Sequence, residues 1–566
     1  MNCSHHLTNF IRCCPIVLAA SLAHAAPTLT KLHDFNNSGV MLGIQGAYDT
    51  PVLIGSELWF TTEKGGDYGF GTLASFNLAN NTPTKRVSMN QTGNTPQGTP
   101  ALDDGILYYT NTRGGTGDRG TLSIYQIASG THSTLWNSPS NSPATNPNTP
   151  SGNVAVIDRG PLGKDIYMLT QNGGSGAAIG TILRYQSIDG SISLVHAFGP
   201  APDSRQPFKG FTVVGKKLYF TTFTGGNISP SGSPSGTATN GTGTLNELDV
   251  TTRGAEIYHQ LAVLPVVDGS TRFPAHNPYY RAADHSLYFT TVGTASQPGS
   301  IQKFQLATKT LSTLHEITAL PADGISYPEG RFIYGPLTEW NRSLYYATAQ
   351  GGPTGNGGTI NRYHLDSKSH EVLFHLNSDA GSNPGGGVRG GFLHNGSSSF
   401  PAFYLLTRDG GMHDHGTVLR LNLDPPLPPS PYEAWLASHP SLTGADSIPS
   451  ADPDRDGLNN LTEFAFGTPP THATAPNPST LSQDSQTFEI RWTARSDSSI
   501  TYTVTTSLTL DAGATPWEPL LSAVEILSPP DIPVSAGYER RRVHIPINEQ
   551  KAFFRVEASF AIGTTP

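Results

Sequence analysis

Short segments that alternate apolar and polar residues recur along the chain, and each has the pattern of two strands around a glycine loop. One of them is LYYTNTRGGTGDRGTLSIY, residues 107–125: an apolar-aromatic segment, a Thr-rich end, a double glycine, then Gly-Thr and a second apolar segment. Alternation rich in aromatic and β-branched residues is typical of half-buried β-strands. The pattern predicts an all-β region built from repeated strand pairs.

The unit occurs seven times by inspection. Six copies carry a double glycine, starting at residues 65, 114, 173, 225, 351 and 410, whereas the fifth has Gly293-Thr294. The fourth copy carries a Ser/Gly/Thr-rich insertion between Asn227 and Gly243. Further strand-like segments, such as STLHEI and FKGFTVVG, follow and precede the copies. Because four short antiparallel strands make one propeller blade, residues 26–424 are predicted to form a seven-bladed β-propeller.

The two ends of the repeat array complement each other. The seventh copy runs from LRLNLD directly into PPLPPSP, so its last strand is missing. The segment TKLHDF, residues 30–35, matches the last strand of other copies and has no strand pair of its own before it. We therefore expect residues 27–36 to complete the seventh blade, an N-terminal strand closure that leaves no open strand edge.

Two repeated features have a structural explanation. The double glycines suit tight connections between antiparallel strands, which need positive φ angles. A nucleotide-binding loop is the competing interpretation, but no copy is followed by a helical pattern. The last strand of several copies carries a histidine, and we expect these side chains to pack within the repeats rather than to share one metal ion: His33, His196, His259, His315 and His375.

The repeats resemble the GloVer tandem-repeat family of exported bacterial proteins, which implies a propeller-like exported domain and no established activity.

A second kind of site follows the Pro-rich linker at 425–431. The stretch DPDRDGLNNLTE, residues 452–463, fits the twelve-position EF-hand loop, with Gly457 at its sharp turn. The spacing predicts Ca²⁺ ligands at positions 1, 3, 5, 7, 9 and 12, with Leu458 contributing its backbone carbonyl: Asp452, Asp454, Asp456, Leu458, Asn460 and Glu463. The alternative is an acidic, solvated linker that happens to match, and the role that we expect for the ion is structural. The motif resembles the calcium loops of dockerin-like and thrombospondin type 3 segments.

The remaining parts of the chain are assigned more simply. Residues 432–476 form the EF-hand-like calcium segment with a short helix, NNLTEFAF. Residues 477–566 contain alternating segments such as FEIRWTAR and AFFRVEASF, which predict a small β-sandwich. Trp492 and Trp517 are expected in its core, with a carbohydrate platform as the alternative. Residues 1–25, with Arg12, a short apolar run and AHAA, predict a signal peptide cleaved after Ala25.

Amino-acid composition limits the classes of partner that the protein can have. Charged residues make up 14% of the chain and the net charge is −9, with no basic stripe, so nucleic acid is not expected as a partner. No other stretch of the sequence is long and apolar enough to predict a transmembrane anchor. The three cysteines, Cys3, Cys13 and Cys14, lie in the signal segment. We expect a protein that is secreted, periplasmic or at the cell surface and that lacks disulfides.

One face of the predicted propeller would carry the glycine loops and several charged residues. The candidates are Lys64, Asp67, Arg113, Asp118, Arg119, Arg408, Asp409, His413, Asp414 and His415. The cluster of His413, Asp414 and His415 resembles an acid–base site, but matching partners are not evident in other copies. The sequence favours a non-catalytic protein that binds an unidentified extracellular polymer or surface protein through this face. The alternative is an extracellular propeller hydrolase or lyase acting on polysaccharide.

Overall fold

The computed structural model describes residues 27–36, 43–139, 146–174, 179–199, 202–226, 242–264, 273–274, 276–292, 299–317, 327–353, 356–379, 381–397, 400–423, 431–472, 479–484, 486–497, 499–507, 517–520, 522–546 and 553–560. The repeats form one compact unit, residues 24–281 and 286–426, here called the repeat unit. Residues 427–566 belong to a second, here called the C-terminal unit. The predicted signal peptide, most of the fourth-copy insertion and the Pro-rich linker up to residue 430 lie outside the described residues.

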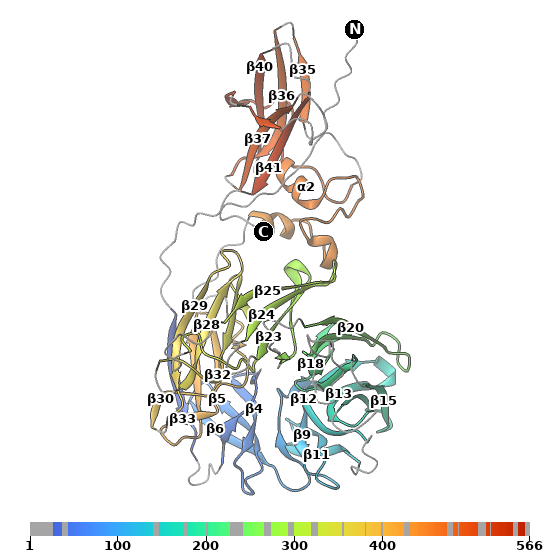
Figure 1. Cartoon of the computed structure of the whole chain (residues 1–566), viewed down its shortest axis with the longest axis vertical. Coiled ribbons are helices and arrows are strands. Elements are labelled where there is room, and N and C mark those ends of the chain that lie inside the picture. Colours follow the sequence, from blue (N-terminus) through green and yellow to red (C-terminus); the bar gives the residue numbers. More distant parts are fainter. Residues whose placement is uncertain are drawn as a thin grey trace, which may run out of the picture. The chain divides into compact units, whose positions relative to one another are not determined.

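Within its described part, the repeat unit contains seven antiparallel sheets of four or five strands, which succeed one another in chain order (Figure 1). The sheets of the first four repeats consist of β2 Gln45–Ala47, β3 Val52–Ile54, β4 Glu57–Lys64, β5 Thr72–Asn77 and β6 Thr82–Ser88; β7 Asn94–Pro96, β8 Ala101–Asp103, β9 Ile106–Arg113, β10 Thr121–Gln126 and β11 Thr131–Asn137; β12 Asn148–Asp158, β13 Lys164–Asn172, β14 Thr181–Gln186 and β15 Ile192–Ala197; and β16 Ser204–Pro207, β17 Thr212–Val214, β18 Lys217–Gly225, β19 Thr244–Asp249 and β20 Ile257–Val263.

The later repeats follow the same plan. Their strands are β21 Phe273–Pro274, β22 Tyr279–Arg281, β23 Ser286–Val292, β24 Ser300–Gln305 and β25 Thr310–Glu316; β26 Thr338–Trp340, β27 Ser343–Ala347, β28 Asn356–His364 and β29 His370–Asn377; and β31 Leu393–His394, β32 Ala402–Leu406 and β34 Thr417–Asn422, with a small additional sheet of β30 Ser382–Gly386 and β33 Asp409–Gly411. In most repeats the first strand is split into two short pieces that pair with the same neighbour. The expected plan of repeated antiparallel strands is confirmed, and the fold is all-β and β-propeller-like.

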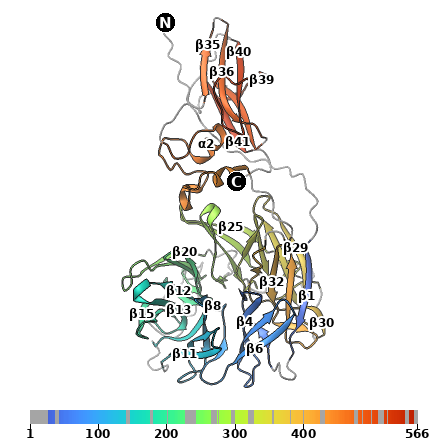
Figure 2. The same ribbon diagram turned by 180° about the vertical axis from the view of Figure 1, so that it is seen from behind.

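The N-terminal strand belongs to the sheet of the seventh repeat. β1, Thr28–Asp34, pairs antiparallel with β34, so that Thr28 lies opposite Asn422 and Asp34 opposite Thr417. Figure 2 shows this blue strand beside β32 and β29. The Asp34 carboxylate accepts the backbone N–H of Met412 at 2.9 Å. The expected pairing of the N-terminal segment with the seventh repeat is therefore present.

Neighbouring repeats meet through backbone that leaves no room for a side chain. A Cβ atom added to Gly98 would lie 2.4 Å from the backbone carbon of Gly152, and one added to Gly152 would lie 2.1 Å from that of Lys209. Gly98 and Lys209 lie between the two pieces of the first strand in the second and fourth repeats, and Gly152 lies at the register shift within the unsplit β12 of the third. The hydroxyl of Thr110 also donates to the carbonyl of Gly152 at 2.9 Å. The sheets are thus joined at their first strands by direct backbone contact.

Contacts of the same kind join the seventh repeat to the first. A Cβ on Gly390 would lie 2.3 Å from the backbone carbon of Asp49. The N–H of Gly391 donates to the Thr50 hydroxyl at 2.7 Å, and the N–H of Gly46 donates to the carbonyl of His415 at 3.2 Å. The ends of the array are therefore linked by more than the β1–β34 pairing.

The double glycines have the predicted conformation. Both residues of all six pairs have positive φ, between +73° and +97°. A third glycine that precedes the Thr of each such copy has positive φ as well, for example Gly71 at +100°, where a Cβ would meet the carbonyl oxygen of Thr62 at 2.2 Å. The loops consequently require glycine for two reasons, backbone conformation and space.

The repeated histidines follow the predicted packing role only in part. His33, His196 and His315 are half-buried and contact aromatic or imidazole rings, as in the stack of His196 on Tyr258 at 4.1 Å. His259 and His375 are exposed, so a packing role does not extend to them. The strand register explains the difference, because His33, His196 and His315 lie opposite equivalent residues of the neighbouring strand, whereas His259 lies opposite Glu247 and His375 opposite Thr359, at other positions of the repeat.

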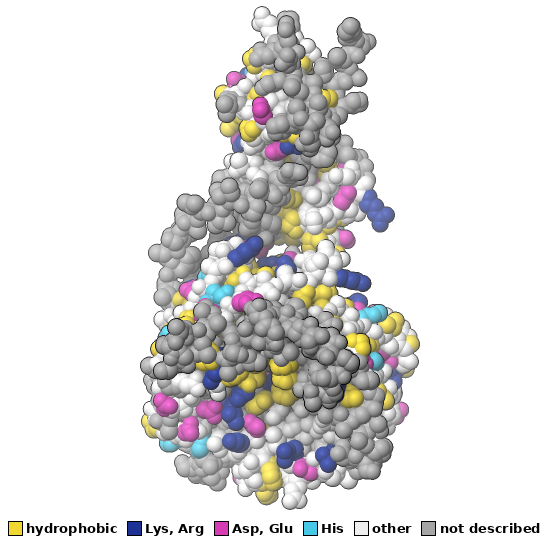
Figure 3. Space-filling model, in the orientation of Figure 1, with side chains coloured by type: hydrophobic (Ala, Val, Ile, Leu, Met, Phe, Trp, Pro, Cys, Tyr) yellow, Lys and Arg dark blue, Asp and Glu magenta, His cyan; other side chains and the backbone are white. Residues whose placement is uncertain are grey.

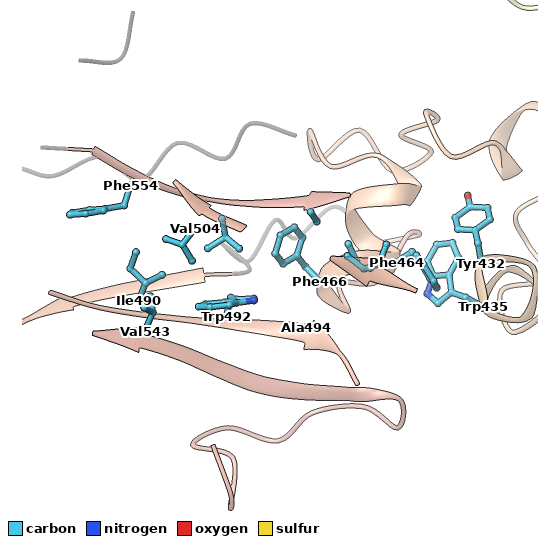
Figure 4. Close-up of a cluster of buried hydrophobic side chains, with 14 of the residues drawn as sticks. Tyr432, Trp435, Phe464, Phe466, Ile490, Trp492, Ala494, Val504, Val543 and Phe554 are labelled. Carbon is cyan, nitrogen blue, oxygen red and sulfur yellow. The ribbon is translucent and has the colours of Figure 1, made fainter. Parts of the chain in front are cut away.

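The C-terminal unit has one continuous core. It contains α1 Pro431–Ala437, α2 Asn460–Phe466, β35 Ser479–Gln483, β36 Thr487–Arg495, β37 Ile500–Ser507, β38 Glu518–Pro519, β39 Val524–Ile526, β40 Tyr538–Pro546 and β41 Phe553–Phe560. The strands form two antiparallel sheets, β35-β36-β40-β39 and β38-β37-β41. Side chains from α1, α2 and both sheets share one apolar cluster (Figure 4), including Trp435, Phe464 and Trp492. The expected core position of Trp492 is confirmed by its 1% exposure.

Within the described residues, no helix has the length and apolar character needed to cross a membrane.

We expect deletion of residues 27–36 to lower the melting temperature of the repeat unit markedly. The deletion removes β1 together with Phe35, a core side chain that is 1% exposed in the intact unit, and exposes the edge of β34. A chain that begins at residue 26 is the matched control, and both are compared by thermal unfolding followed by circular dichroism. Equal melting temperatures would show that the strand is dispensable.

Candidate calcium site and loop face

The predicted calcium loop forms a compact turn held by its own carboxylates. The N–H of Gly457 donates to Asp452 at 3.0 Å, and the N–H of Leu458 donates to Asp456 at 2.8 Å. Gly457 has φ +94°, as the sharp turn at position six requires. Carboxylate oxygens of Asp452, Asp454 and Asp456 lie within 4.8 Å of one another. The structure therefore brings together the three aspartates that the spacing predicts.

Helix α2 positions the last two predicted ligands. Asn459 caps the helix by accepting the N–H of Thr462 at 2.9 Å, and Gly467 ends it in the left-handed conformation. Asn460 and Glu463 are both fully buried on this short helix. The Asn460 amide donates to the carbonyls of Asp446 at 2.7 Å and Ile448 at 2.8 Å, which fixes the orientation of its oxygen.

Several oxygen atoms of this loop are buried without any hydrogen bond. They are Asp452 Oδ1, Asp454 Oδ2, Asn460 Oδ1 and both carboxylate oxygens of Glu463. Burial, together with the charges of Asp454, Asp456 and Asp452, raises the pKa of Glu463 to about 8. Unpartnered buried carboxylates are costly unless a cation or hydrogen-bond donor satisfies them. The donor set is entirely oxygen and negatively charged, so these residues fit a hard divalent cation such as Ca²⁺.

Acidic residues on the loop face of the repeat unit serve the glycine loops. Asp118 and Asp414 stand at equivalent positions, both with positive φ, and accept the N–H of Gly114 at 2.7 Å and of Gly410 at 2.9 Å. The Asp414 carboxylate is therefore engaged in shaping its loop. Its neighbour His413 is exposed, whereas His415 is half-buried. Of the three residues in this cluster, Asp414 thus has a structural role in its loop.

The other predicted loop-face residues divide into paired and unpaired groups. Asp67 forms an ion pair with Lys85, and Arg408 lies 3.6 Å from Glu63 and from Asp409. Arg113 and Arg119 make no ion pair with any residue that the structure describes. Figure 3 shows basic and acidic side chains gathered over the part of the view where β4, β6 and β9 lie in Figure 1.

The two unpaired arginines line an open pocket of about 440 Å³, here called the loop-face pocket. Its wall is contributed by the second, third and fourth repeats and is mainly polar, with one aromatic side chain: Gln97, Arg113, Asp118, Arg119, Thr149, Gln171 and Phe208 are among its residues. Thr149 has φ +60°, an unusual conformation for a β-branched residue. The pocket offers guanidinium and amide donors suited to carboxylate or hydroxyl groups.

Sequence reasoning missed a cluster of charged residues from three repeats. Lys209 Nζ lies 3.2 Å from Asp49, and His276 Nε2 lies 3.3 Å from the other oxygen of the same carboxylate. All three side chains are buried, at 3–5% exposure. Burial opposes ionisation of Asp49, but the charges of Lys209 and His276 outweigh it and hold the pKa of Asp49 well below its usual range. Burial lowers the pKa of His276.

This buried cluster was detectable only from an alignment of the repeats. Asp49 and Lys209 each stand next to a backbone contact between repeats, where the second and third repeats have glycine. The sequence signal for this cluster was a charged residue, Asp49 or Lys209, at a position where other repeats have glycine. The cluster is almost sealed from solvent and links the first, fourth and fifth repeats.

Comparisons with known proteins add little beyond the fold. No family model matches the sequence, and no curated protein matches it. Among solved structures, the chain is similar to a nidogen–laminin complex with 13% identity over 54% of this chain and 90% of that chain, at a TM-score of 0.33. It is also similar to TolB from Acinetobacter baumannii, with 15% identity over 53% and 58% and a TM-score of 0.30. An oligogalacturonate lyase in complex with manganese gives 12% identity over 73% and 98%, with a TM-score of 0.40. At these identities and scores the similarities assign no activity.

Proposed function

We propose that this chain is an exported, non-catalytic binding protein that takes up its ligand on the loop face of a seven-bladed β-propeller. The seven described sheets, the β1–β34 pairing and the backbone links from the seventh repeat to the first support the closed ring. The signal-like residues 1–25 support export to the periplasm, the cell surface or the medium. The C-terminal strands form a small β-sandwich that shares its core with the calcium segment.

The observation that carries the binding role is the contrast between the loop-face pocket and the buried cluster. The pocket is open and contains two guanidinium groups without ion pairs, Arg113 and Arg119. The convergent titratable groups Asp49, Lys209 and His276 are almost completely buried. A catalytic site needs such groups in contact with substrate, whereas a binding site needs accessible donors.

The pocket chemistry favours a polymer that bears carboxylates, such as an acidic polysaccharide. Guanidinium groups bind carboxylates through paired N–H donors, and Gln97 and Gln171 supply further donors and acceptors for hydroxyls. Phe208 offers an apolar surface to a sugar ring. The extended loop face allows a polymer to continue past the pocket across neighbouring glycine loops.

The calcium loop is proposed to bind one Ca²⁺ with a structural role, through Asp452, Asp454, Asp456, the Leu458 carbonyl, Asn460 and Glu463. The buried, unpartnered oxygens of Asp452, Asp454, Asn460 and Glu463 support the ion. The ion would offset the repulsion among four carboxylates and secure α2 against the core of the C-terminal unit, in which Phe464 is fully buried. Extracellular sites of this type bind at about 10⁻⁴–10⁻³ M.

Calcium is expected to stabilise the C-terminal unit and leave the repeat unit nearly unchanged. At free Ca²⁺ about ten times the dissociation constant, mass action adds about 1.4 kcal/mol to the unit that folds with the ion. Glu463→Gln should abolish the effect and also stabilise the calcium-free protein near neutral pH. The Glu463 carboxyl is ionised in the unfolded chain but its pKa is raised to about 8 in the folded one, so folding must protonate it, whereas Gln carries no such cost. Calorimetric titration and thermal unfolding with and without chelator measure both effects.

Asp446→Asn is the matched control for this experiment. Asp446 is exposed and near the loop, and its contact with Asn460 is through the backbone carbonyl. This variant removes one negative charge while keeping the proposed ligands. The site is refuted if the wild-type protein shows no calcium heat and no calcium-dependent stabilisation.

Binding of the protein to acidic polysaccharides is expected to depend on Arg113 and Arg119. In affinity electrophoresis, a chain beginning at residue 26 should be retarded by polygalacturonate or alginate and not by neutral glucans. Added salt should weaken the retardation, because the contacts are between charged groups near the surface. Arg113→Gln with Arg119→Gln should lower the affinity by about tenfold or more, the loss of one or two charge-assisted contacts.

Lys309→Gln with Lys368→Gln is the charge-matched control, since both lysines are exposed at turns between strands. This pair should bind as the wild type does. Products are measured in the same samples as new reducing ends and unsaturated uronate absorbance. Product release that survives purification would replace the binding role with a hydrolase or lyase, and equal loss in both double variants would reject the pocket.

A further inference from the structure

A second group of ligand-type side chains lies where the fifth and sixth repeats meet. His315 comes from the last strand of the fifth repeat, β25, and His370 begins the last strand of the sixth, β29. Glu329 lies in the segment that leads into the sixth repeat. One nitrogen of each imidazole and one oxygen of the carboxylate lie within 4.8 Å of one another. None of these residues belongs to the loop-face pocket or the calcium loop.

The three side chains point at a common place. The Nε2 atom of His315 lies 2.9 Å from Glu329 Oε2, and the Nδ1 atom of His370 lies 3.7 Å from the same oxygen. The two imidazole rings are stacked, with centroids 4.4 Å apart and planes inclined by 15°. Two ligand atoms on a tetrahedral Zn²⁺ lie about 3.3 Å apart, given metal–ligand bonds of about 2.0–2.1 Å. The observed distances lie on either side of that value, so small side-chain adjustments would accommodate an ion.

The surroundings support these residues as ligands. The other ring nitrogen of His370 lies 3.3 Å from the side-chain oxygen of Asn361, an arrangement that orients metal-binding imidazoles in known sites. The Tyr346 hydroxyl is fully buried without a hydrogen-bond partner, and its ring centroid lies 6.1 Å from that of His370. A metal ion at this place, or a water molecule bound to that ion, would give the Tyr346 hydroxyl oxygen the partner that it lacks.

The equivalent place between the third and fourth repeats shows what is special here. There His196 stacks on Tyr258 with centroids 4.1 Å apart, and Asp203 holds the position of Glu329. Asp203 is engaged by the N–H groups of Gly199 at 2.6 Å and Ser204 at 2.7 Å. Stacking of two rings therefore occurs at both junctions. Of the two junctions, only that of the fifth and sixth repeats combines two imidazoles with a carboxylate.

We propose that His315, Glu329 and His370 bind a divalent transition-metal ion of the Zn²⁺ class. Two imidazoles and one carboxylate suit zinc and its neighbours in the first transition series, whereas calcium prefers oxygen donors alone. The ion would tie the last strand of one sheet to that of the next. No cysteine follows Cys14 in the sequence, so a metal here supplies a cross-link that disulfides cannot.

The decisive variant is His370→Tyr, because the equivalent position of the fourth repeat already holds Tyr258 in the same stacked arrangement. The fold should therefore tolerate the change while one ligand is lost. His196→Gln is the matched control, since it removes a histidine from the equivalent junction. Chelator-treated protein is titrated with ZnCl₂ by calorimetry in millimolar Ca²⁺, which occupies the calcium loop. Co²⁺ is used as a visible-spectrum probe of the coordination geometry.

The wild-type protein and His196→Gln are expected to bind one equivalent of Zn²⁺ and to give the intense visible bands of tetrahedral Co²⁺. His370→Tyr should bind at least about a hundredfold more weakly, with a melting temperature in chelator close to that of the wild type. Absence of Zn²⁺ binding by the wild type would overturn the proposal. So would unchanged binding by His370→Tyr, or an equal loss in His196→Gln.

Discussion

The repeat unit depends on close backbone contact between the first strands of neighbouring sheets. The contacts at Gly98, Gly152 and Gly390 leave no space for a Cβ atom, so any side chain there would push two sheets apart. Because each contact uses backbone from two repeats, no single repeat can satisfy it alone. Asp49 and Lys209 each stand at one of these contacts, where other repeats have glycine, and their buried ion pair links the first repeat to the fourth. Such a pair is costly to break, since either charge left alone would be buried without a partner.

The glycine loops shape the face to which the binding role is proposed. The double glycines carry the chain through positive φ angles, and Asp118 and Asp414 hold the loops by accepting backbone N–H groups. Loops shaped by their own backbone leave other side chains free for a ligand. Arg113 and Arg119 are of this kind, and they stand at the rim of an open pocket. Binding on rigid loops above a scaffold of sheets is a common use of such folds.

The sequence predicted those features that depend on local pattern. Strand pairs, glycine loops and helix α2 follow from periodicity, turn chemistry and capping residues within a few positions of each other. The β1 pairing was predicted from the repeat instead, because the seventh copy lacks a last strand that the N-terminal segment matches. The three calcium-loop aspartates were predicted for the same reason, because their spacing alone brings them together. The burial of Glu463 in the core of the C-terminal unit was not predicted, since it depends on how α2 packs on the strands.

Sites made from distant repeats could not be predicted in the same way. Asp49, Lys209 and His276 are far apart in the sequence and meet only because the sheets share a junction. His370 does not belong to the repeated histidine series that the strand pattern revealed. Its meeting with His315 and Glu329 depends on the stacking of neighbouring sheets. Long-range convergence of this kind requires the register and order of the sheets, which a single sequence does not supply.

The most direct test of the backbone junction is a comparison of two glycine substitutions in the third repeat. Gly152 and Gly160 both have positive φ, so alanine costs about 1–2 kcal/mol at either position. At Gly160 nothing lies within 4 Å of the added Cβ, whereas at Gly152 it would meet the backbone of Lys209 at 2.1 Å. Chemical unfolding should therefore show Gly152→Ala to be less stable than Gly160→Ala by about 1–3 kcal/mol, the usual cost of overpacking. Equal stability of the two variants would contradict the claim that direct backbone contact holds the repeats together.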